Sequence, residues 1–261
     1  MTDSLRRAIL SAWVWMAVIL LILAWYPLML VVRLTDRDPV RYRTGRWFRR
    51  LGVAMTKVNP FWRIELSGQD LEDPRHPYVV VSNHQSMADI PIISHLPWEM
   101  KWVAKTELFA LPVIGKLLRL AGDIELERGD RRSGARMIHT AERYLKGRCS
   151  VMIFPEGTRS VDGSIGKFTD GAFHLAIRAG VPLLPIAVDG SRNCLPKHSW
   201  LFGDPCTIRV RVLPPVPTDG LGPGDIPALR EKLRELIAGQ VAAWRSSTLS
   251  DTLQSSAGNP S

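Results

Sequence analysis

The longest apolar run of the chain lies near its N-terminus. Residues 8–32 form a stretch of 25 positions without a charged side chain. As a helix, such a run would be about 37 Å long, enough to cross a hydrocarbon core of about 30 Å with some tilt. The run predicts a membrane helix, or a helical hairpin that enters one leaflet, and the sequence does not separate these two topologies.

A basic amphipathic pattern follows over residues 40–58. Apolar residues recur there at helical spacing: Trp47, Phe48, Leu51, Ala54, Met55 and Val58. The opposite side carries Arg43, Arg46, Arg49, Arg50 and Lys57. The pattern is typical of a helix that lies in a membrane interface, and a helix packed on the domain with a solvated basic face is the alternative. We therefore expect residues 1–58 to form a membrane-anchoring segment.

Short strand-like and helix-like segments alternate from residue 62 onward. Strands are expected at 62–66, 78–81, 100–104, 124–126, 149–154, 181–188 and 207–213. Helices are expected at 90–95, 112–121, 133–146 (capped by Ser133), 171–179 and after Asp225. Alternation of this kind predicts an α/β fold, with a mixed sheet flanked by helices, over residues 59–245. The Ser-rich polar segment 246–261 is expected to be disordered.

Charge and cysteine usage narrow the function. The formal net charge of +9 favours an anionic partner, either nucleic acid, anionic lipid or a phosphorylated substrate. No recognised DNA- or RNA-binding module accompanies the charge, so nucleic acid is not expected. The three cysteines lack C-x-x-C spacing, which argues against a disulfide framework or a zinc site and fits a reducing compartment. Arginines on both sides of the apolar run favour a body that faces the cytoplasm.

A histidine follows the apolar strand that ends near Val81. His84 comes after a polar turn, and Asp89 lies five residues further on. A histidine that titrates near neutral pH, beside a carboxylate that orients its ring, is a general-base unit. Five residues along one helix rotate by about 500°, so the two side chains meet only if His84 lies at or before the first turn.

Three cations stand just after predicted strands, where ligands bind in open α/β sheets. Arg159 lies in the run Glu156-Gly157-Thr158-Arg159, in which Gly157 permits a close backbone approach and Thr158 offers a hydroxyl. Lys105 and Arg128 follow two other strands. Together with His84, the three cations suggest a base that acts on a phosphorylated alcohol. No cluster of metal-ligating residues is visible in the sequence.

The chain resembles the glycerolipid acyltransferases, and among them the 1-acyl-glycerol-3-phosphate acyltransferases. Four blocks match in order over about residues 62–215: His84 to Asp89, a block ending in Arg128, Glu156 to Arg159, and an apolar block that contains Pro182 and Pro185. The resemblance implies that His84 is the catalytic base and that Asp89 orients it. It implies acceptor binding by Glu156, Arg159 and Arg128, together with Gly157, Thr158 and Lys105 at matching positions.

The activity implied by the resemblance is transfer of a fatty acyl group from acyl-CoA or acyl carrier protein to the free hydroxyl of a lysophospholipid. Phosphatidic acid would then be formed from 1-acyl-glycerol-3-phosphate at the cytoplasmic side of the inner membrane, with no metal or further cofactor. Thr169 follows Phe168 where relatives usually have lysine, which leaves another lyso-lipid, such as a lyso-ornithine lipid, as a second possible acceptor. The same residues are also compatible with a thioesterase or with a non-catalytic lipid-binding scaffold.

Overall fold

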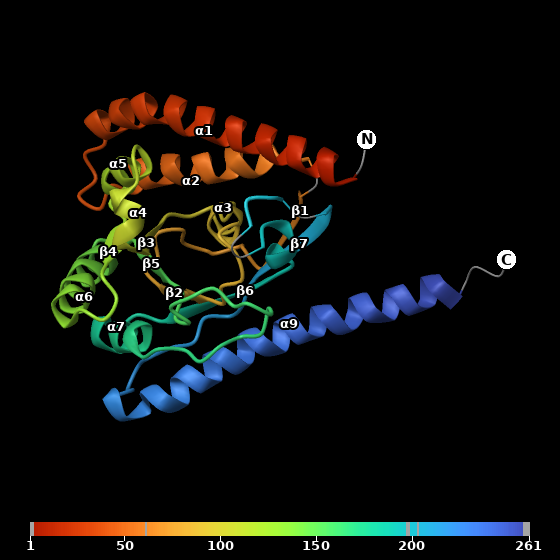
Figure 1. The fold of residues 1–261 in the computed structure, drawn as a ribbon. Helices are drawn as coiled ribbons and strands as arrows, with labels where there is room; N and C mark the ends of the chain where they lie inside the picture. The colour runs from red at the N-terminus through yellow and green to blue at the C-terminus, as the bar shows by residue number, and fades with distance from the viewer. Residues whose placement is uncertain (1–2, 61, 197–198, 203, 258–261) are drawn as a thin grey trace.

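The computed structural model describes residues 3–60, 62–196, 199–202 and 204–257 and contains one mixed seven-stranded sheet (Figure 1). Its order is β1-β7-β6-β2-β5-β3-β4. The strands are β1 (Trp62–Ser67), β2 (Val79–Ser82), β3 (Met100–Lys105), β4 (Ile124–Leu126), β5 (Ser150–Ile153), β6 (Leu183–Asp189) and β7 (Cys206–Val212). The only antiparallel pair among them joins β6 to β7. The predicted mixed α/β sheet is confirmed, and each strand begins or ends within two residues of its expected position.

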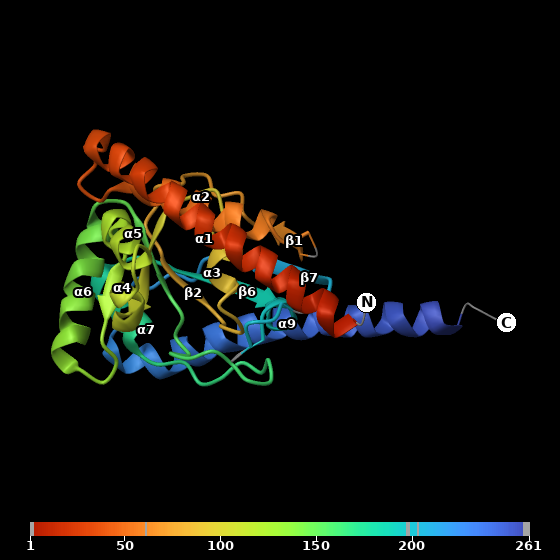
Figure 2. The same ribbon diagram turned by 45° about the horizontal axis from the view of Figure 1, so that its top comes forward.

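Helices cover both faces of the sheet (Figures 1 and 2). One face carries α1 (Asp3–Thr35), α2 (Tyr42–Lys57) and α3 (Asp89–Ile93), and the other carries α6 (Arg131–Lys146), α7 (Gly171–Ala179) and α9 (Ile226–Ala257). The shorter helices are α4 (Thr106–Ala110), α5 (Ile114–Ala121) and α8 (Ser191–Cys194), and a 3₁₀ turn covers Pro223–Asp225. The helix α4 was not expected from the sequence.

The strands in the middle of the sheet separate two apolar cores. In β2, Val79 and Val81 pack against α6 and α7, whereas Val80 packs against α3. All three are fully buried. Since successive side chains of a strand point to opposite faces, a continuous apolar run is what a strand covered on both sides requires. This arrangement leaves the carboxyl end of β2 as the place where the chain can turn polar.

The apolar N-terminal run is one long helix that lies along α2 rather than standing away from the body (Figure 1). Its inner side is buried, through Val14 and Val18 against the sheet-side core and through Met29 against Leu51 of α2. The indole nitrogen of Trp25 donates a hydrogen bond to the backbone oxygen of Trp47, at 2.9 Å. The predicted helix and basic amphipathic helix are both present, and they pack on each other.

Three local expectations need correction. The N-cap of α6 is Asp130, whose carboxylate accepts hydrogen bonds from two backbone amides, and Ser133 instead accepts one from the Glu127 amide. The last helix continues to Ala257, so the expected disorder from residue 246 is wrong as far as that residue, and residues 258–261 lie outside the described range. Cys194 and Cys206 form a disulfide, although the sequence argued against one.

Candidate active site

The carboxyl ends of four neighbouring parallel strands meet at one edge of the sheet. The strands β2, β5, β3 and β4 are adjacent in that order and run in the same direction. His84 follows β2, the Glu156–Arg159 run follows β5, Lys105 ends β3, and Arg128 follows β4. The fold therefore brings to one edge the side chains that the sequence selected from four separate segments.

His84 and Asp89 are in direct contact. The ring nitrogen Nδ1 of His84 lies 2.7 Å from Oδ2 of Asp89. Asp89 is the first residue of α3, and His84 lies in the loop before it, so the chain turns back and brings the two side chains together. The geometric condition set by the five-residue spacing is met. The catalytic role of the pair stays a prediction.

The carboxylate of Asp89 is fixed by its own loop. Its Oδ2 atom also accepts hydrogen bonds from the backbone amides of Gln85 (2.7 Å) and Ser86 (2.9 Å), and the residue is fully buried. Three donors at one oxygen fix the position of this side chain. Because Oδ2 of Asp89 accepts from Nδ1–H, the neutral imidazole carries its lone pair on Nε2.

Asn83 anchors the start of the same loop, although the sequence pattern indicated only that the strand ends there. Its side chain donates from Nδ2 to the backbone oxygen of Val188 and accepts at Oδ1 from the Val188 amide. These bonds reproduce a backbone pair between β2 and β6 at the point where β2 has ended. Gln85 also donates to Val188, and the Ser86 hydroxyl donates to the backbone oxygen of Leu195. An asparagine just after an apolar strand was the signal available in the sequence.

Glu156 contacts the backbone of His84. Oε1 of Glu156 accepts a hydrogen bond from the His84 amide at 2.7 Å, and Oε2 accepts one from the Gly166 amide at 2.9 Å. The backbone oxygen of His84 in turn accepts from the Ser160 amide. Burial raises the pKa of the Glu156 carboxyl, against the effect of these two donors. In this geometry Glu156 positions His84, which differs from the acceptor-binding role implied by the resemblance.

An aromatic ring supports the imidazole. Phe154, the residue after β5, stacks on His84 with ring centroids 4.0 Å apart and an interplanar angle of 14°. Trp102 of β3 lies behind Phe154, with centroids 5.8 Å apart. The His84 side chain is 11% exposed, so the ring is held on several sides and retains limited access to solvent. Neither aromatic residue was named as a site residue from the sequence.

The three predicted cations differ in environment. Lys105 is exposed at the junction of β3 and α4, and Arg128 is exposed two residues after β4. Arg159 is half-buried. Burial lowers the pKa of Arg128, and nearby Glu107 acts in the opposite direction. All three lie at or just after the carboxyl ends of β3, β4 and β5, and their role in binding stays a prediction.

Gly157 and Thr158 lie in the turn that connects Glu156 to Arg159. Gly157 has φ +70°, a left-handed conformation that favours glycine, and no atom lies within 4 Å of where its Cβ would be. Thr158 is exposed. The turn thus combines an open backbone with an exposed hydroxyl-bearing side chain at the mouth of the site. Both residues occupy positions at which a substrate could approach closely.

The arrangement fits a base that removes a proton from a polar substrate. A neutral His84 with its Nδ1–H held by Asp89 presents Nε2 as a proton acceptor. Among the described residues, no group of three or more His, Cys, Asp or Glu side chains gathers in a way that could hold a metal ion. The bordering cations suit an anionic substrate group.

Comparison with known proteins gives consistent likenesses. Residues 63–189 match the model of the Acyltransferase family. The chain is 41% identical over 176 residues to mouse (Mus musculus) 1-acyl-sn-glycerol-3-phosphate acyltransferase alpha, a match of 66% of this chain and 61% of that protein. It is 34% identical over 180 residues to a chloroplastic 1-acyl-sn-glycerol-3-phosphate acyltransferase of Arabidopsis thaliana, covering 69% of this chain and 50% of the relative.

A solved structure shares the fold over nearly the whole chain. The 1-acyl-sn-glycerophosphate (LPA) acyltransferase of Thermotoga maritima superposes with a TM-score of 0.79 at 24% identity. The match covers 94% of this chain and 98% of that chain. The chain thus spans about half to three-fifths of the length of its sequence relatives but the full length of this structural neighbour.

Proposed function

We propose that this chain, which belongs to the acyltransferase family, transfers a fatty acyl group from an acyl thioester to the free hydroxyl of a lysophospholipid. The acceptor we propose is 1-acyl-glycerol-3-phosphate, and the product is phosphatidic acid. The observation that carries the proposal is the 2.7 Å contact between His84 and a buried Asp89 at the carboxyl edge of the sheet. The names of the sequence relatives support the choice of acceptor.

The proposed reaction needs one base and no covalent enzyme intermediate. Nε2 of His84 takes the proton of the acceptor hydroxyl while the oxygen attacks the thioester carbonyl carbon. The tetrahedral intermediate collapses, the carbon–sulfur bond breaks, and the thiolate leaves. The imidazolium, stabilised by Asp89, returns its proton to the thiolate, so the base is regenerated. Base catalysis of this kind typically contributes about 10²–10⁴-fold, and substrate orientation must supply the rest.

The cations at the same edge supply the recognition of the acceptor phosphate. Arg159 offers a planar fork of donors, and Lys105 and Arg128 add positive charge from the neighbouring strands. Such groups also suit the phosphates of coenzyme A or the acidic surface of an acyl carrier protein. We propose an acyl thioester of either carrier as donor, and no metal or further cofactor.

The acceptor is a membrane lipid, and α1 provides the membrane contact. Its outer side exposes a stripe of large apolar residues: Leu5, Ile9, Trp13, Met16, Ile19, Leu20, Leu23, Leu30, Val31 and Leu34. The helix is long and apolar enough to cross a membrane, yet its other side is packed along the body. We propose that α1 lies in the cytoplasmic leaflet of the inner membrane, since crossing would separate it from α2.

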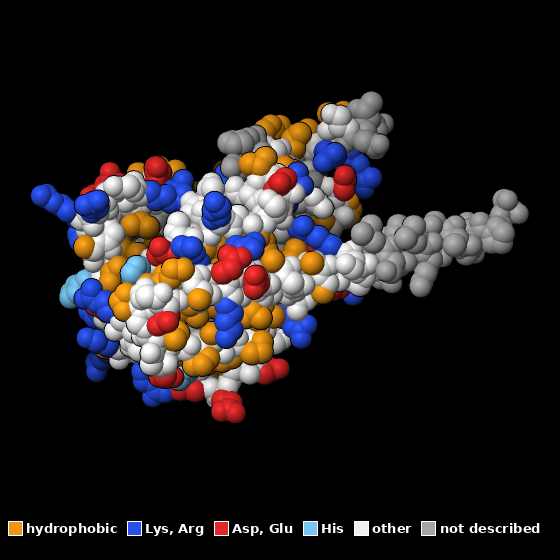
Figure 3. All heavy atoms as spheres, turned by 90° about the horizontal axis from the view of Figure 1, so that it is seen from below, with side chains coloured by type: hydrophobic (Ala, Val, Ile, Leu, Met, Phe, Trp, Pro, Cys, Tyr) orange, Lys and Arg blue, Asp and Glu red, His pale blue; other side chains and the backbone are white. Residues whose placement is uncertain are grey.

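The opposite side of the molecule differs in character. Seen from the side of α9, basic and acidic side chains are interspersed with apolar ones over the surface (Figure 3). A mixed-charge surface of this kind is typical of contact with water. The orientation we propose therefore places α1 in lipid and α9 in the cytoplasm, with the active-site edge between them.

A panel of acceptors tests the proposed function. Purified full-length enzyme is given a labelled acyl-CoA or acyl carrier protein with 1-acyl-glycerol-3-phosphate, other lysophospholipids and a lyso-ornithine lipid in turn. We expect labelled phosphatidic acid with the first acceptor. Transfer only to acceptors without a phosphate would refute the assignment, and acyl release without acceptor would indicate a thioesterase. A His84→Ala enzyme that folds and retains full function would indicate a scaffold.

A further inference from the structure

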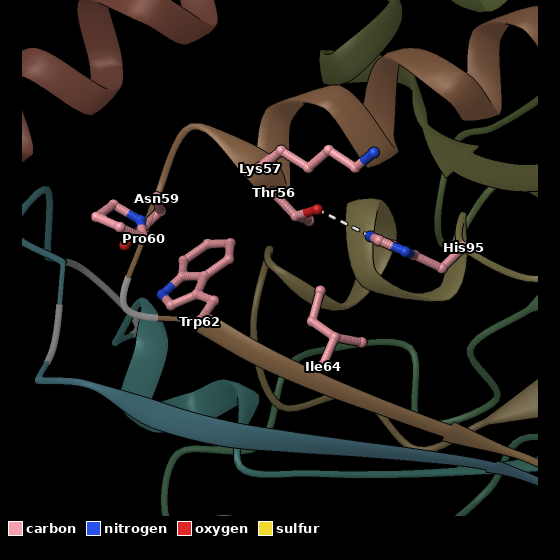
Figure 4. A pocket seen from close by; sticks show the side chains of 7 residues that line it. All are labelled: Thr56, Lys57, Asn59, Pro60, Trp62, Ile64 and His95. Atoms are coloured by element: carbon pink, nitrogen blue, oxygen red, sulfur yellow. Dashed lines mark hydrogen bonds between the residues drawn. The ribbon is translucent and has the colours of Figure 1, made fainter.

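A hollow opens at the end of α2, and the proposed acyl transfer uses none of its residues (Figure 4). It has a volume of about 350 Å³. Its walls come from three segments, the carboxyl end of α2, the start of β1 and the residue two positions beyond α3. The lining residues are Thr56, Lys57, Asn59, Pro60, Trp62, Ile64 and His95.

The hydrogen bonds of Thr56 determine which ring nitrogen of His95 carries the proton. The Thr56 hydroxyl donates to the backbone oxygen of Val53 at 2.8 Å, so it accepts from Nε2–H of His95, also at 2.8 Å. In the neutral imidazole the other nitrogen, Nδ1, then carries a lone pair. A second proton on the ring would convert Nδ1 into a donor without disturbing the bond to Thr56. The ring can therefore accept a proton at Nδ1 while it keeps the bond to Thr56.

The charges around the hollow favour an anion. Among the described residues that line it, Lys57 and His95 are the titratable ones, and neither Asp nor Glu is present. Lys57 extends along the same side of the hollow as His95 (Figure 4). Burial, and then the positive charge of Lys57, lower the pKa of His95. A bound anion would neutralise that repulsion and stabilise the protonated imidazole.

The other walls are apolar and are connected to the membrane helix. The ring of Trp62 contacts that of Phe202 with centroids 5.5 Å apart, and Phe202 contacts Trp15 of α1 at 5.4 Å. Ile64 and Pro60 complete the apolar lining. Indole rings favour the boundary between headgroups and hydrocarbon. The hollow thus combines a cationic side with an aromatic side that leads to the helix proposed to lie in lipid.

We propose that this hollow is a second lipid site, which binds the headgroup phosphate of an anionic membrane phospholipid. Lys57 supplies a permanent positive charge, and His95 supplies a donor once the phosphate has drawn a proton onto its ring. Trp62 and Ile64 pack against the glycerol and the first part of the acyl chains. The site rests on the proposed membrane position of α1, and it is separate from the acceptor site beside His84.

Nuclear magnetic resonance of the histidine rings tests the site directly. Full-length protein with ¹³C-labelled histidine, held in a non-ionic detergent, is titrated with dihexanoylphosphatidylglycerol and, separately, with inorganic phosphate. A His95→Gln variant assigns the His95 signal. We expect that signal to shift saturably with the lipid, with a raised pKa for His95, and to respond much more weakly to inorganic phosphate, which cannot use Trp62.

Two lysine variants separate a site from general attraction. Lys57→Ala should raise the apparent Kd for the lipid by about fivefold or more, because one cation near an anionic headgroup contributes about fivefold to affinity. Lys116 is also exposed and lies near α1, with its amine over the Tyr26 ring, but outside the hollow. Lys116→Ala should change the titration by no more than about twofold. Equal effects of the two variants would refute a defined site.

The remaining outcomes are equally decisive. An unmoved His95 signal would refute the site, and equal saturation by inorganic phosphate would show a free-phosphate site rather than a lipid site. The same titration of a His84→Ala enzyme keeps this test independent of acyl transfer. Lipid binding that persists without turnover supports the second site even if the proposed reaction fails.

Discussion

At the scale of single residues, two carboxylates hold one histidine from different sides. Asp89 accepts from the ring of His84, and Glu156 accepts from its backbone amide. We expect Asp89→Asn to lower kcat by about 100-fold or more, because an amide can neither stabilise the imidazolium nor fix the tautomer as an anion does. Steady-state acyl transfer measures the loss. The exposed Asp70→Asn is the matched control, and unchanged turnover in Asp89→Asn would contradict general-base catalysis.

Glu156 should affect both activity and the pH dependence of stability. Glu156→Gln places an NH₂ group against one of two backbone amides, so we expect a loss of about tenfold in kcat, with a smaller change in KM. Burial raises the pKa of Glu156 above that of the unfolded chain, so the native state binds the proton more tightly. Its contribution to stability is then present at acid pH and lost as pH rises through the raised pKa.

Urea unfolding at several pH values measures this contribution. The wild-type chain should lose a component of stability above pH 4.5 that Glu156→Gln does not lose. A higher KM for the acceptor, with kcat retained, would instead assign Glu156 to acceptor binding. That outcome would restore the role implied by the family resemblance.

The sequence could predict which residues reach the site but not all of what they do there. The His84–Asp89 contact follows from a strand end, a polar loop and a helix start, which are local features. The bonds of Asn83 to Val188 and of Glu156 to the His84 amide join segments 105 and 72 residues apart. Such contacts depend on strand order, which no local pattern of the sequence specifies.

At the scale of elements, a buried ion cluster fastens α2 to the sheet. Arg49 of α2 pairs with Asp123, and its Nε lies 3.6 Å from Glu99, which pairs with Lys101 at 3.0 Å. All four side chains are at most 3% exposed. This pairing shows why one arginine of the basic helix is not on a solvated face. The amphipathic pattern placed Arg49 among the exposed cations, and the buried carboxylates that hold it come from other elements.

We expect Arg49→Met to destabilise the fold by about 3–5 kcal/mol, because it leaves the buried carboxylate of Asp123 without its ion-pair partner. Chemical denaturation measures the change. Arg63→Met, at an exposed pair with Glu65, is the matched control and should cost less than about 1 kcal/mol. Similar stability of the two variants would show that the cluster is dispensable.

The exposed stripe of α1 supplies the next prediction. Leu20 and Leu23 are 58% and 51% exposed, so a charge at either is tolerated by the fold. In lipid the same charges are costly, and we expect Leu20→Glu with Leu23→Glu to move the protein from the membrane pellet to the supernatant after a high-salt wash. Leu236→Glu on α9, which is 41% exposed, should stay in the pellet. Retention of the double variant would contradict the proposed position of α1.

At the scale of the whole molecule, the segment between β6 and β7 connects α1 to the histidine loop. The Phe202 amide donates to the Ser11 hydroxyl of α1, and the Trp15 indole donates to the backbone oxygen of Trp200. At its other end the backbone oxygen of Leu195 accepts from Ser86. The sequence predicted α1 and the histidine loop, but not the contacts through which the segment between β6 and β7 joins them. The linking contacts span 185 and 191 residues on one side and 109 on the other.

A disulfide between Cys194 and Cys206 closes this connecting segment. The cysteine pattern of the sequence had argued against a disulfide, and that prediction was wrong. Spacing and an odd count of cysteines carry no information on which sulfurs the fold brings together, and Cys194 and Cys206 meet because α8 packs beside the start of β7. The third cysteine, Cys149, is buried, and burial raises the pKa of its thiol to about 12. The native protein should therefore be inert to alkylation at neutral pH.

Alkylation under denaturing conditions counts the thiols. Protein purified without reductant should label at Cys149 alone, and reduction before labelling should expose all three cysteines.

A chain with Cys194→Ser and Cys206→Ser should lose about 2–4 kcal/mol of stability, as expected for a bridge of this loop length. Its acyl transfer should fall as well, because the segment that supports Ser86 is less constrained. Labelling of three thiols without reductant would restore the sequence prediction, and would leave the connection between α1 and the histidine loop to the hydrogen bonds and aromatic contacts alone.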